Sequence, residues 1–381
     1  MTIRTTVGEV VIKAPYGRDP QTGQWLFAIR EEWGLRPHQL MSPVLEDKVC
    51  FTATVTLSYE RTAAVAAKWG SPLDDATIDR HVQQTGERAE ALTQERVARA
   101  LSPQTRGEVV GEANANAPAG EFSLVVMLDG WMIRERGPDW GLKPPETKAD
   151  RVDWREMKSA IVFRADQRGR TQSGRPLLVE KFYVAWRGDP EELGRRVYAE
   201  ALRRGLNQAR WVYVVADGGV WIWNIVADRF GKATGVLDFY HASAHLWAVA
   251  HELFGEGSAE AKAWVEPLVH QLKHGGEAGV LGRLEDLLTL CADWDEAKRT
   301  PVEREVAYFR NHREHLHYQR VHAAGCPNGS GAMESTCSQF QDRFKRTGQF
   351  WTLPGENHLM ALELARRNED WDEIWWLDSE R

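Results

Sequence analysis

The sequence predicts an α/β fold in which a mixed sheet is interrupted by an all-helical segment and preceded by a smaller helical region. Two short apolar runs, FSLVVMLDG and WVYVVADGG, are continuous and bounded by glycine, a pattern typical of strands buried on both faces. Strand-like and helix-like patterns alternate along residues 122–255. Residues 256–322 instead carry a helical pattern almost throughout, which indicates that helices interrupt the sheet.

Composition indicates a globular chain with room for two or three domains. The 381 residues are 43% hydrophobic and 27% charged. No apolar stretch approaches the ~18 residues of a membrane span, so we expect no membrane partner. The chain begins without an apolar leader, and its four cysteines form no C-x-x-C pair, which favours a reducing cytoplasm.

The net charge of −7 argues mildly against nucleic-acid binding, because phosphate contacts need Lys and Arg. Most of the negative charge lies in residues 251–381, however, and the chain carries local basic clusters. These clusters are Arg195, Arg196, Arg203 and Arg204 on one expected helix, and Arg343, Lys345 and Arg346 on another.

We expect five segments along the chain. A β-containing segment is followed by a helix-turn-helix candidate, the first part of the core, a helical insertion, and a C-terminal core helix with an acidic tail. Their expected bounds are 1–56, 57–115, 116–255, 256–322 and 323–381, in that order. The low-complexity stretch GEANANAPAGE separates the second segment from the core.

The helix-turn-helix candidate contains two helix-like stretches around a Gly-Ser-Pro break, and the second helix is predicted to begin near Asp75. The side chains expected to point outward are Thr77, Arg80, His81 and Gln84. In a major groove, Arg80 is the best candidate for a base contact, because a guanidinium can bind guanine through two hydrogen bonds. A helical hairpin used for packing or dimerisation is an equally good interpretation.

The core segment follows the order β-β-β-α-β-α-β. The strand-like runs are FSLVVMLDGWMIRER, MKSAIVFRAD, PLLVEKFYVAWRG, WVYVVADG and GVLDFY, and the helices include DPEELGRRVYAEALRRGLNQA and HASAHLWAVAHELFG. This order resembles that of a ribonuclease H-like core. The gap before the last helix is too long for one crossover, so residues 256–322 are expected to be an insertion.

Three carboxylates stand where such a core would gather them. Asp129 and Asp217 end the two buried runs, and Glu334 opens the helix in GSGAMESTCSQF. Carboxylates at the ends of adjacent strands meet at one sheet edge, and such like charges are costly unless divalent cations lie between them. Two Mg²⁺ ions roughly 4 Å apart would activate the attacking oxygen and stabilise the leaving oxygen of a phosphoryl transfer. Each acid alone is more typical of a turn or a helix start, but their joint placement favours a metal site.

Several segments resemble DDE-type transposases of bacterial insertion sequences. They include LDGWMIRERGPDWG, EKFYVAWRG, VVADGGVWIWNIVADRFG, LDFYHASAHLW and GSGAMES, within residues 122–376. The layout is similar to that of Mutator-type relatives, whose C/D-x-x-H element matches Asp238 and His241 here. The resemblance implies that Asp129, Asp217 and Glu334 are catalytic and hold two Mg²⁺ or Mn²⁺ ions, with Asp238 and His241 in a supporting role.

The same resemblance implies hydrolysis of a DNA strand at a transposon end, followed by attack of the released 3′-hydroxyl on target DNA. The implied partners are double-stranded DNA, both terminal inverted repeats and target, and further copies of the chain in a homodimer or larger homo-oligomer in the bacterial nucleoid. Trp221 and Trp223 follow Asp217 closely and could stack on unpaired bases, although tryptophans in such positions more often fill interfaces. The remaining candidate DNA contacts are Arg343, Lys345 and Arg346.

Two other functions fit the same sequence. A domesticated DNA-binding protein would keep the fold without the reaction. A mononuclear zinc hydrolase would use Asp238, His241 and His245, because the two histidines are four residues apart on one helical face. A later group, His312, His315, His317, His322 and Cys326, is expected on a solvated or DNA-facing surface. The three functions differ in the metal they need. The transposase needs Mg²⁺ or Mn²⁺, the domesticated DNA-binding protein needs no metal, and the hydrolase needs zinc.

Overall fold

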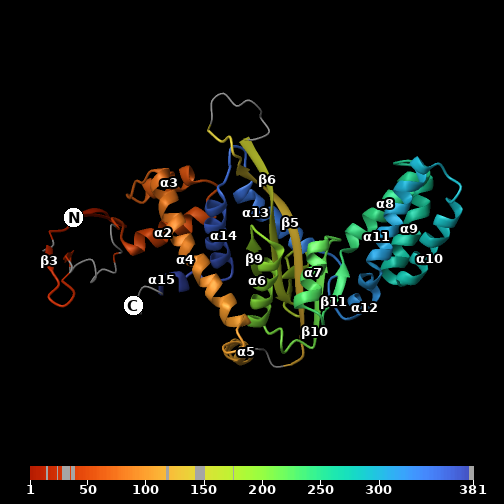
Figure 1. Ribbon diagram of the computed structural model, residues 1–381, viewed down its shortest axis with the longest axis horizontal. Coiled ribbons are helices and arrows are strands. Elements are labelled where there is room, and N and C mark those ends of the chain that lie inside the picture. Colours follow the sequence, from red (N-terminus) through yellow and green to blue (C-terminus); the bar gives the residue numbers. More distant parts are fainter. Residues whose placement is uncertain are drawn as a thin grey trace. The chain divides into compact units, whose positions relative to one another are not determined.

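The computed structural model describes residues 1–13, 16–23, 25–27, 35, 39–116, 120–141, 151–174 and 176–376 (Figure 1). The chain forms two compact units. The terminal unit comprises Met1–Arg96, Met132–Glu156 and Ser338–Arg381, and the sheet unit comprises Val97–Trp131 and Met157–Cys337. The last five residues of the expected acidic tail lie outside the described residues.

The sheet unit is built on a five-stranded mixed sheet with the strand order β11-β10-β5-β6-β9. The strands are β5 (Ser123–Arg136), β6 (Val152–Arg164), β9 (Phe182–Trp186), β10 (Trp211–Ala216) and β11 (Thr234–Leu237), and a small hairpin of β7 (Arg168–Arg170) and β8 (Pro176–Leu178) precedes β9. Strand β10 pairs in parallel with both β5 and β11, whereas β6 pairs antiparallel with β9. The predicted mixed α/β class is therefore confirmed.

Strand β5 matches the strand-like run predicted for residues 122–136. The apolar run from Leu124 to Leu128 is fully buried, as its continuous pattern indicates. Asp129 ends only this buried apolar part, because β5 continues to Arg136, as the strand-like run FSLVVMLDGWMIRER predicted. Trp131 remains buried beyond the acid, and its indole N–H donates to the Ser159 hydroxyl of β6 at 3.0 Å. This contact extends the strand past Asp129.

Helices α6 (Pro190–Arg203) and α7 (Val220–Arg229) pack on the sheet through a shared apolar cluster. Helix α6 begins at Asp189, whose carboxylate accepts the backbone N–H of Glu192 at 2.8 Å. A Cβ atom on Gly194 would lie 3.2 Å from Cγ1 of Ile225, so the glycine lets the two helices approach closely. Helix α5 (Arg106–Ala115) packs against the far end of α6.

Residues 256–322, all of which the structure describes, contain helices and no strand. The helices after β11 are α8 (Phe239–Phe254), α9 (Ala259–His274), α10 (Glu277–Leu290), α11 (Glu296–Asn311) and α12 (Tyr318–Ala323), with a 3₁₀ turn η2 (Arg313–His315). Helix α8 packs against α9 and α11, and α10 packs against the same two helices (Figure 1). The helical pattern of this stretch is therefore present as a bundle.

The terminal unit is mainly helical. Its elements include α2 (Pro43–Val55), α3 (Tyr59–Lys68), most of α4 (Asp75–Leu101), α14 (Leu353–Arg367), α15 (Glu373–Trp376), and the strands β1 (Thr2–Thr5), β2 (Gly8–Val11), β3 (Tyr16–Arg18) and β4 (Trp25–Phe27). Helices α3 and α4 occupy the two stretches in which helices were expected, and α4 begins at the expected residue. None of the described helices is long and apolar enough to cross a membrane.

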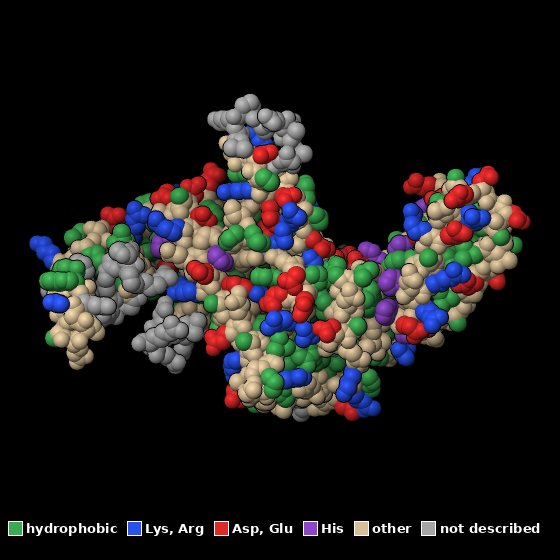
Figure 2. Space-filling view, in the orientation of Figure 1, with side chains coloured by type: hydrophobic (Ala, Val, Ile, Leu, Met, Phe, Trp, Pro, Cys, Tyr) green, Lys and Arg blue, Asp and Glu red, His purple; other side chains and the backbone are tan. Residues whose placement is uncertain are grey.

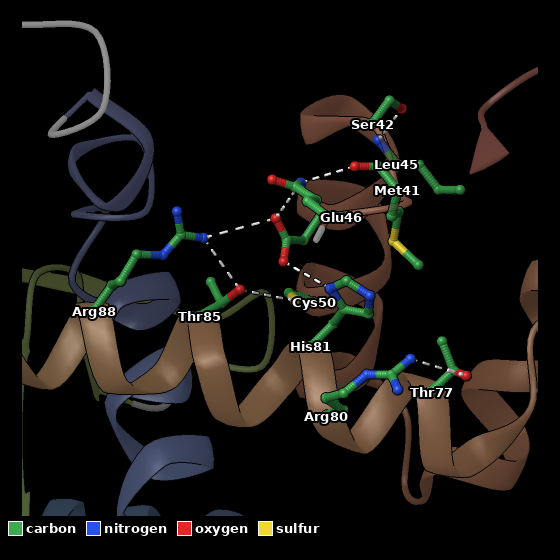
Figure 3. Close-up of polar contacts among 11 residues, drawn as sticks. Met41, Ser42, Leu45, Glu46, Cys50, Thr77, Arg80, His81, Thr85 and Arg88 are labelled. Atoms are coloured by element: carbon green, nitrogen blue, oxygen red, sulfur yellow. Dashed lines mark hydrogen bonds and ion pairs between the residues drawn. The ribbon is translucent and has the colours of Figure 1, made fainter. Parts of the chain in front are cut away.

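A buried carboxylate joins α2 to α4 (Figure 3). Glu46 is 1% exposed and accepts hydrogen bonds from Nδ1 of His81 at 2.7 Å and from the Gln39 amide at 3.1 Å, while Arg88 lies 4.0 Å away. The expectation that His81 points outward is therefore wrong, because its ring is buried against Glu46. A buried carboxylate without these partners would destabilise the fold.

The other three outward-facing candidates on α4 keep their expected exposure. Arg80 and Gln84 are exposed, and Thr77 is half-buried. The Thr77 backbone N–H and hydroxyl both donate to the carboxylate of Asp74, at 2.7 and 2.9 Å. Arg80 in turn donates to the Thr77 hydroxyl at 3.5 Å.

We predict that Gly86→Ala destabilises the terminal unit. A Cβ atom on Gly86 of α4 would lie 2.4 Å from the backbone oxygen of His358 in α14, so the helices would have to separate. We expect a loss of ~1–3 kcal/mol in the free energy of unfolding, measured by denaturant titration. Gly111→Ala in α5 is the matched control, because no atom lies within 4 Å of its Cβ position. The control should gain stability through helix propensity, and an equal gain for Gly86→Ala would contradict the close approach.

Candidate active site

Two carboxylates lie next to each other on neighbouring strands. The parallel register pairs Leu128 of β5 with Ala216 of β10, so Asp129 and Asp217 are the next residues on adjacent strands. The Asp217 carboxylate accepts the backbone N–H of Gly219 at 2.9 Å, and the Asp129 carboxylate accepts that of Gly130 at 2.7 Å. The structure therefore brings these two predicted residues together and fixes both by backbone hydrogen bonds.

The neighbouring charges alter the acidity of Asp129. The pKa of Asp129 is raised to about 6, mainly by burial and in part by the negative charge of Asp217. The backbone N–H of Gly130, a hydrogen bond with Cys337 and the charge of His241 act in the opposite direction. A carboxylate that ionises so reluctantly gains from a nearby cation, which stabilises its charged form.

Helix α13 (Gly331–Phe344) carries Glu334 in its first turn and Cys337 one turn later. The Cys337 side chain hydrogen-bonds with Asp129, and burial together with the charges of Asp129 and Glu334 raises the pKa of its thiol. The thiol therefore stays protonated and donates to the carboxylate. The sequence indicated Cys337 only as part of an apolar stripe with Phe340 and Phe344, both of which are buried.

Asp238 links the strand that precedes Asp217 to the helix that carries Glu334. Its own N–H donates to the backbone oxygen of Ala216 at 2.7 Å. Its two carboxylate oxygens accept the backbone N–H groups of His241, at 2.8 Å, and of Ser330. The Ser330 hydroxyl then donates to Glu334 at 3.3 Å. A continuous series of hydrogen bonds thus runs from the end of β10 to the start of α13.

Potential ligand atoms of Asp238, His241 and Glu334 all lie within 4.8 Å of one another. Asp238 is buried, whereas His241 and Glu334 are exposed. Glu334 thus lies with the Asp-x-x-His pair. Asp129 and Asp217 belong to the same neighbourhood, because the charges of Asp217 and His241 both act on Asp129.

The zinc ligand set that includes His245 is wrong. Nδ1 of His245 binds the Glu305 carboxylate at 2.5 Å, and the His245 ring stacks on Tyr308 with 3.6 Å between centroids. Among the described residues, the group that could hold a metal takes Glu334 as its third member and not His245.

Helix α11 and the turn after it contribute a group of aromatic and imidazole rings to this region. Histidines gather on the face of the molecule shown in Figure 2, at the base of the helical bundle. The ring of His315 stacks on Trp223 with 3.7 Å between centroids, and burial lowers the pKa of His315 to about 4. Burial also lowers the pKa of His312. These two histidines are half-buried and pack against Trp223 of α7, so they are less exposed than the expected solvated or DNA-facing surface implies.

Tyr308 belongs to the same group and was not identified from the sequence. Burial raises the pKa of its hydroxyl, and the negative charges of Asp217 and Asp238 raise it further. A hydroxyl influenced by both carboxylates lies close to the site. A single tyrosine in a polar helix gives no sequence pattern that could have indicated this position.

Among the candidate DNA-contact residues, Arg343 is buried and Trp223 is half-buried. Arg343 is only 5% exposed, and its Nε donates to the backbone oxygen of Ala53 at 3.2 Å. Burial lowers the pKa of Arg343, whose guanidinium packs over the ring of Tyr59. Trp223 is covered by His315 and packs against the core cluster. A DNA contact by Arg343 is therefore wrong for this conformation, whereas Trp223 is half-buried and its DNA contact stays a prediction.

The remaining candidates keep some exposed surface. Arg346 is exposed, and Lys345 is half-buried and donates to the Gln341 side chain at 3.3 Å. Trp221 is half-buried against the core cluster, with the Lys158 ammonium 5.7 Å from its ring centroid. These three residues remain candidates for contact with a ligand.

The basic cluster on α6 is largely neutralised within the helix. Arg196 pairs with Glu192 at 3.0 Å, and Arg203 and Arg204 pair with Glu200 at 2.8 and 2.7 Å. This pairing removes much of the positive charge that the sequence indicated for this helix.

A protein-family model matches the chain, and solved structures show similarity to it. The model described as uncharacterised protein family (UPF0236) matches residues 173–380. No curated protein matches the chain. Among solved structures, the chain is similar to the Drosophila P element transposase strand transfer complex, with 11% sequence identity and a TM-score of 0.39 over 86% of this chain and 93% of that chain.

We predict that Asp129→Asn stabilises the metal-free protein above about pH 6. The folded state raises the pKa of Asp129 from 3.8 to about 6, so ionisation opposes folding at neutral pH. This penalty is absent at pH values below the pKa of Asp129 in the unfolded state. It is complete at pH values above the pKa of Asp129 in the folded state. We expect a gain of ~2 kcal/mol near neutral pH and none near pH 4, measured by chemical denaturation with a chelator present. A gain of equal size at both pH values would contradict the electrostatic origin.

Proposed function

The chain belongs to the uncharacterised protein family UPF0236, and from this premise we propose that it is a metal-dependent DNA transposase. It would cut a DNA strand at a transposon end and then join the 3′-hydroxyl to target DNA, acting in the bacterial nucleoid. The observation that carries the proposal is the placement of Asp129 and Asp217 on adjacent parallel strands, with Glu334 held near them by the bonds of Asp238. Acidic clusters of this kind are suited to divalent cations and phosphoryl transfer.

The donor set suits hard divalent cations, and we propose that two of them bind. Asp129, Asp217 and Glu334 offer carboxylate oxygens, and His241 offers an imidazole nitrogen in the group that contains Glu334. Carboxylates suit Mg²⁺ and Mn²⁺, and an imidazole nitrogen favours Mn²⁺ over Mg²⁺. When bound, such cations supply Lewis-acid stabilisation of charge on the attacking and leaving oxygens.

The protein side chains orient the site before any ligand binds. The Gly219 N–H fixes the Asp217 carboxylate, and the Cys337 thiol fixes that of Asp129. Asp238 acts as a positioning residue, because both of its oxygens already accept backbone N–H groups. It orients His241 and Glu334, since it holds the starts of the two helices that carry them. Rigid placement of this kind lowers the cost of reaching the reactive geometry.

The proposed DNA contacts lie outside the carboxylate cluster. On α4, Arg80 and Gln84 are exposed, Thr77 is half-buried, and the three suit a major groove. Lys345 and Arg346 suit phosphate contacts. Trp221 is a candidate for contact with an unpaired base. A reaction that joins two transposon ends requires two active sites close together, so we propose a homodimer or a larger homo-oligomer on double-stranded DNA.

We predict that Asp217→Asn abolishes cleavage of a duplex carrying the inverted repeat that flanks the gene. The change removes one ligand charge but keeps the side-chain oxygen that accepts the Gly219 N–H, so the fold should be preserved. Cleavage is measured with Mg²⁺, Mn²⁺, Zn²⁺ or chelator, and end binding by a mobility shift. We expect cleavage by the parent chain with Mg²⁺ or Mn²⁺ only, and end binding within about twofold of the parent for the variant.

Asp228→Asn on α7 is the matched control, because Asp228 is an exposed acid paired only with Arg229 in the described contacts. It should cut at the parental rate. The proposed function fails if the parent chain cuts none of these duplexes in any metal, or if Asp217→Asn cuts as fast as the parent.

We predict that Arg80→Ala relaxes recognition of the transposon end. Loss of a guanidinium contact to guanine should cost ~1–3 kcal/mol of discrimination between matched and scrambled repeats, measured by competition binding. Arg61→Ala, an exposed arginine on α3, is the control for loss of positive charge alone. Equal discrimination by the Arg80 variant and the parent would assign α3 and α4 to packing or dimerisation instead.

A further inference from the structure

Tyr308 of α11 and His312, which follows the end of that helix, lie directly against the loop after Asp217. A Cβ atom on Gly218 would lie 2.9 Å from the hydroxyl oxygen of Tyr308 and 3.1 Å from Nε2 of His312. Both side chains therefore touch the backbone next to the acid. Gly218 leaves no side chain between them and that backbone, which explains why glycine suits this position.

The ring of Tyr308 is held from two sides. The His245 ring stacks on it with 3.6 Å between centroids and a tilt of 23°, and the His312 ring lies 4.7 Å away. His245 is itself fixed by Glu305, a carboxylate that is only 5% exposed. Because the ring is packed on both sides, the hydroxyl has a fixed direction. Little side-chain conformational entropy is therefore lost when the hydroxyl binds a ligand.

The position of the hydroxyl suits an anionic ligand at the carboxylate site. Tyr308 is half-buried, so its ring is packed but part of the side chain is accessible. The pKa of its hydroxyl is raised by burial and by the charges of Asp217 and Asp238, so the group remains a donor at neutral pH. A fixed donor beside a reacting phosphate stabilises the charge that develops on its oxygens.

We propose that the Tyr308 hydroxyl donates a hydrogen bond to a non-bridging oxygen of the scissile phosphodiester, next to Asp217. This inference rests on the proposed function and adds to it a substrate-contacting residue from the helical stretch. The helical bundle then has a direct part in the reaction in addition to its packing role. His312 supports the same contact by holding the phenol ring.

The alternative is that Tyr308 only anchors α11 on the Gly218 loop. Tyr308→Phe separates the two roles, because phenylalanine keeps the ring that stacks on His245 and lacks only the hydroxyl. A packing role predicts lower stability and little change in the cleavage step. A phosphate contact predicts slower cleavage with stability and end binding nearly unchanged.

The experiment measures single-turnover cleavage by the full chain in Mn²⁺, on the duplex that carries the flanking inverted repeat. We expect Tyr308→Phe to slow cleavage by ~10²-fold, with end binding within about twofold and an unchanged thermal unfolding midpoint. Tyr198→Phe on α6 is the control, because its hydroxyl accepts a hydrogen bond from Arg106. The control should cut at the parental rate.

A second measurement replaces each non-bridging oxygen of the scissile phosphate by sulfur, a weaker hydrogen-bond acceptor. The parent chain should cleave one sulfur-substituted stereoisomer more slowly than the unmodified duplex. Tyr308→Phe should show a much smaller further loss of cleavage rate with that isomer, because the variant already lacks the contact. Parental cleavage by Tyr308→Phe, or full additivity with both isomers, overturns the inference and leaves the proposed function intact. Failure of the parent chain to cut the duplex overturns the proposed function and this inference together.

Discussion

The parallel pairing of β5 with β10 is the constraint on which the candidate site depends. A shift of one residue in either strand would turn one of the two carboxylates to the opposite face of the sheet. The register is fixed by the residues that precede the acids, because Val126, Leu128, Val214 and Ala216 are all buried in the same apolar cluster. The burial of these apolar residues therefore fixes the positions of Asp129 and Asp217. Burying the two carboxylates would by itself oppose folding.

Asp238 connects the end of β10 to the start of α8 and to the residue that precedes α13. A buried carboxylate is tolerated only when its oxygens accept hydrogen bonds, and here both oxygens do so. The spacing of the Asp-x-x-His element has a simple physical reason. An N-cap side chain accepts the backbone N–H three residues later, which places that residue in the first turn of the helix. In α8 the residue is His241, so the motif that caps the helix also positions a potential ligand.

Pairing of charges within the protein limits how the chain could attract DNA. The net charge is −7, and the arginines of α6 are paired with glutamates of the same helix. Arg343 is buried under aromatic rings. On the proposed function, the attraction for phosphate therefore comes from cations held by the carboxylates and from the few exposed basic side chains.

The sequence by itself determined the local features of this protein. Continuous apolar runs indicated β5 and β10, helical periodicity indicated α3, α4 and the helices of residues 256–322, and the Asp-Gly endings indicated two acids at one edge of the sheet. These features could be predicted because a helical period or an apolar run is formed by residues that are close together in the sequence. The strand-like run FSLVVMLDGWMIRER also indicated that β5 continues past Asp129, where Trp131 contacts β6.

Only the tertiary structure decided which distant side chains meet. Glu334 lies with Asp238 and His241, His245 turns away to Glu305, and Tyr308 reaches the loop after Asp217. Tertiary packing likewise buries His81 and Arg343, two polar residues whose helical positions alone suggested exposure. No local pattern encodes these contacts. Each depends on the packing of elements far apart in the chain, and a buried polar group takes whichever partner that packing brings within hydrogen-bond distance.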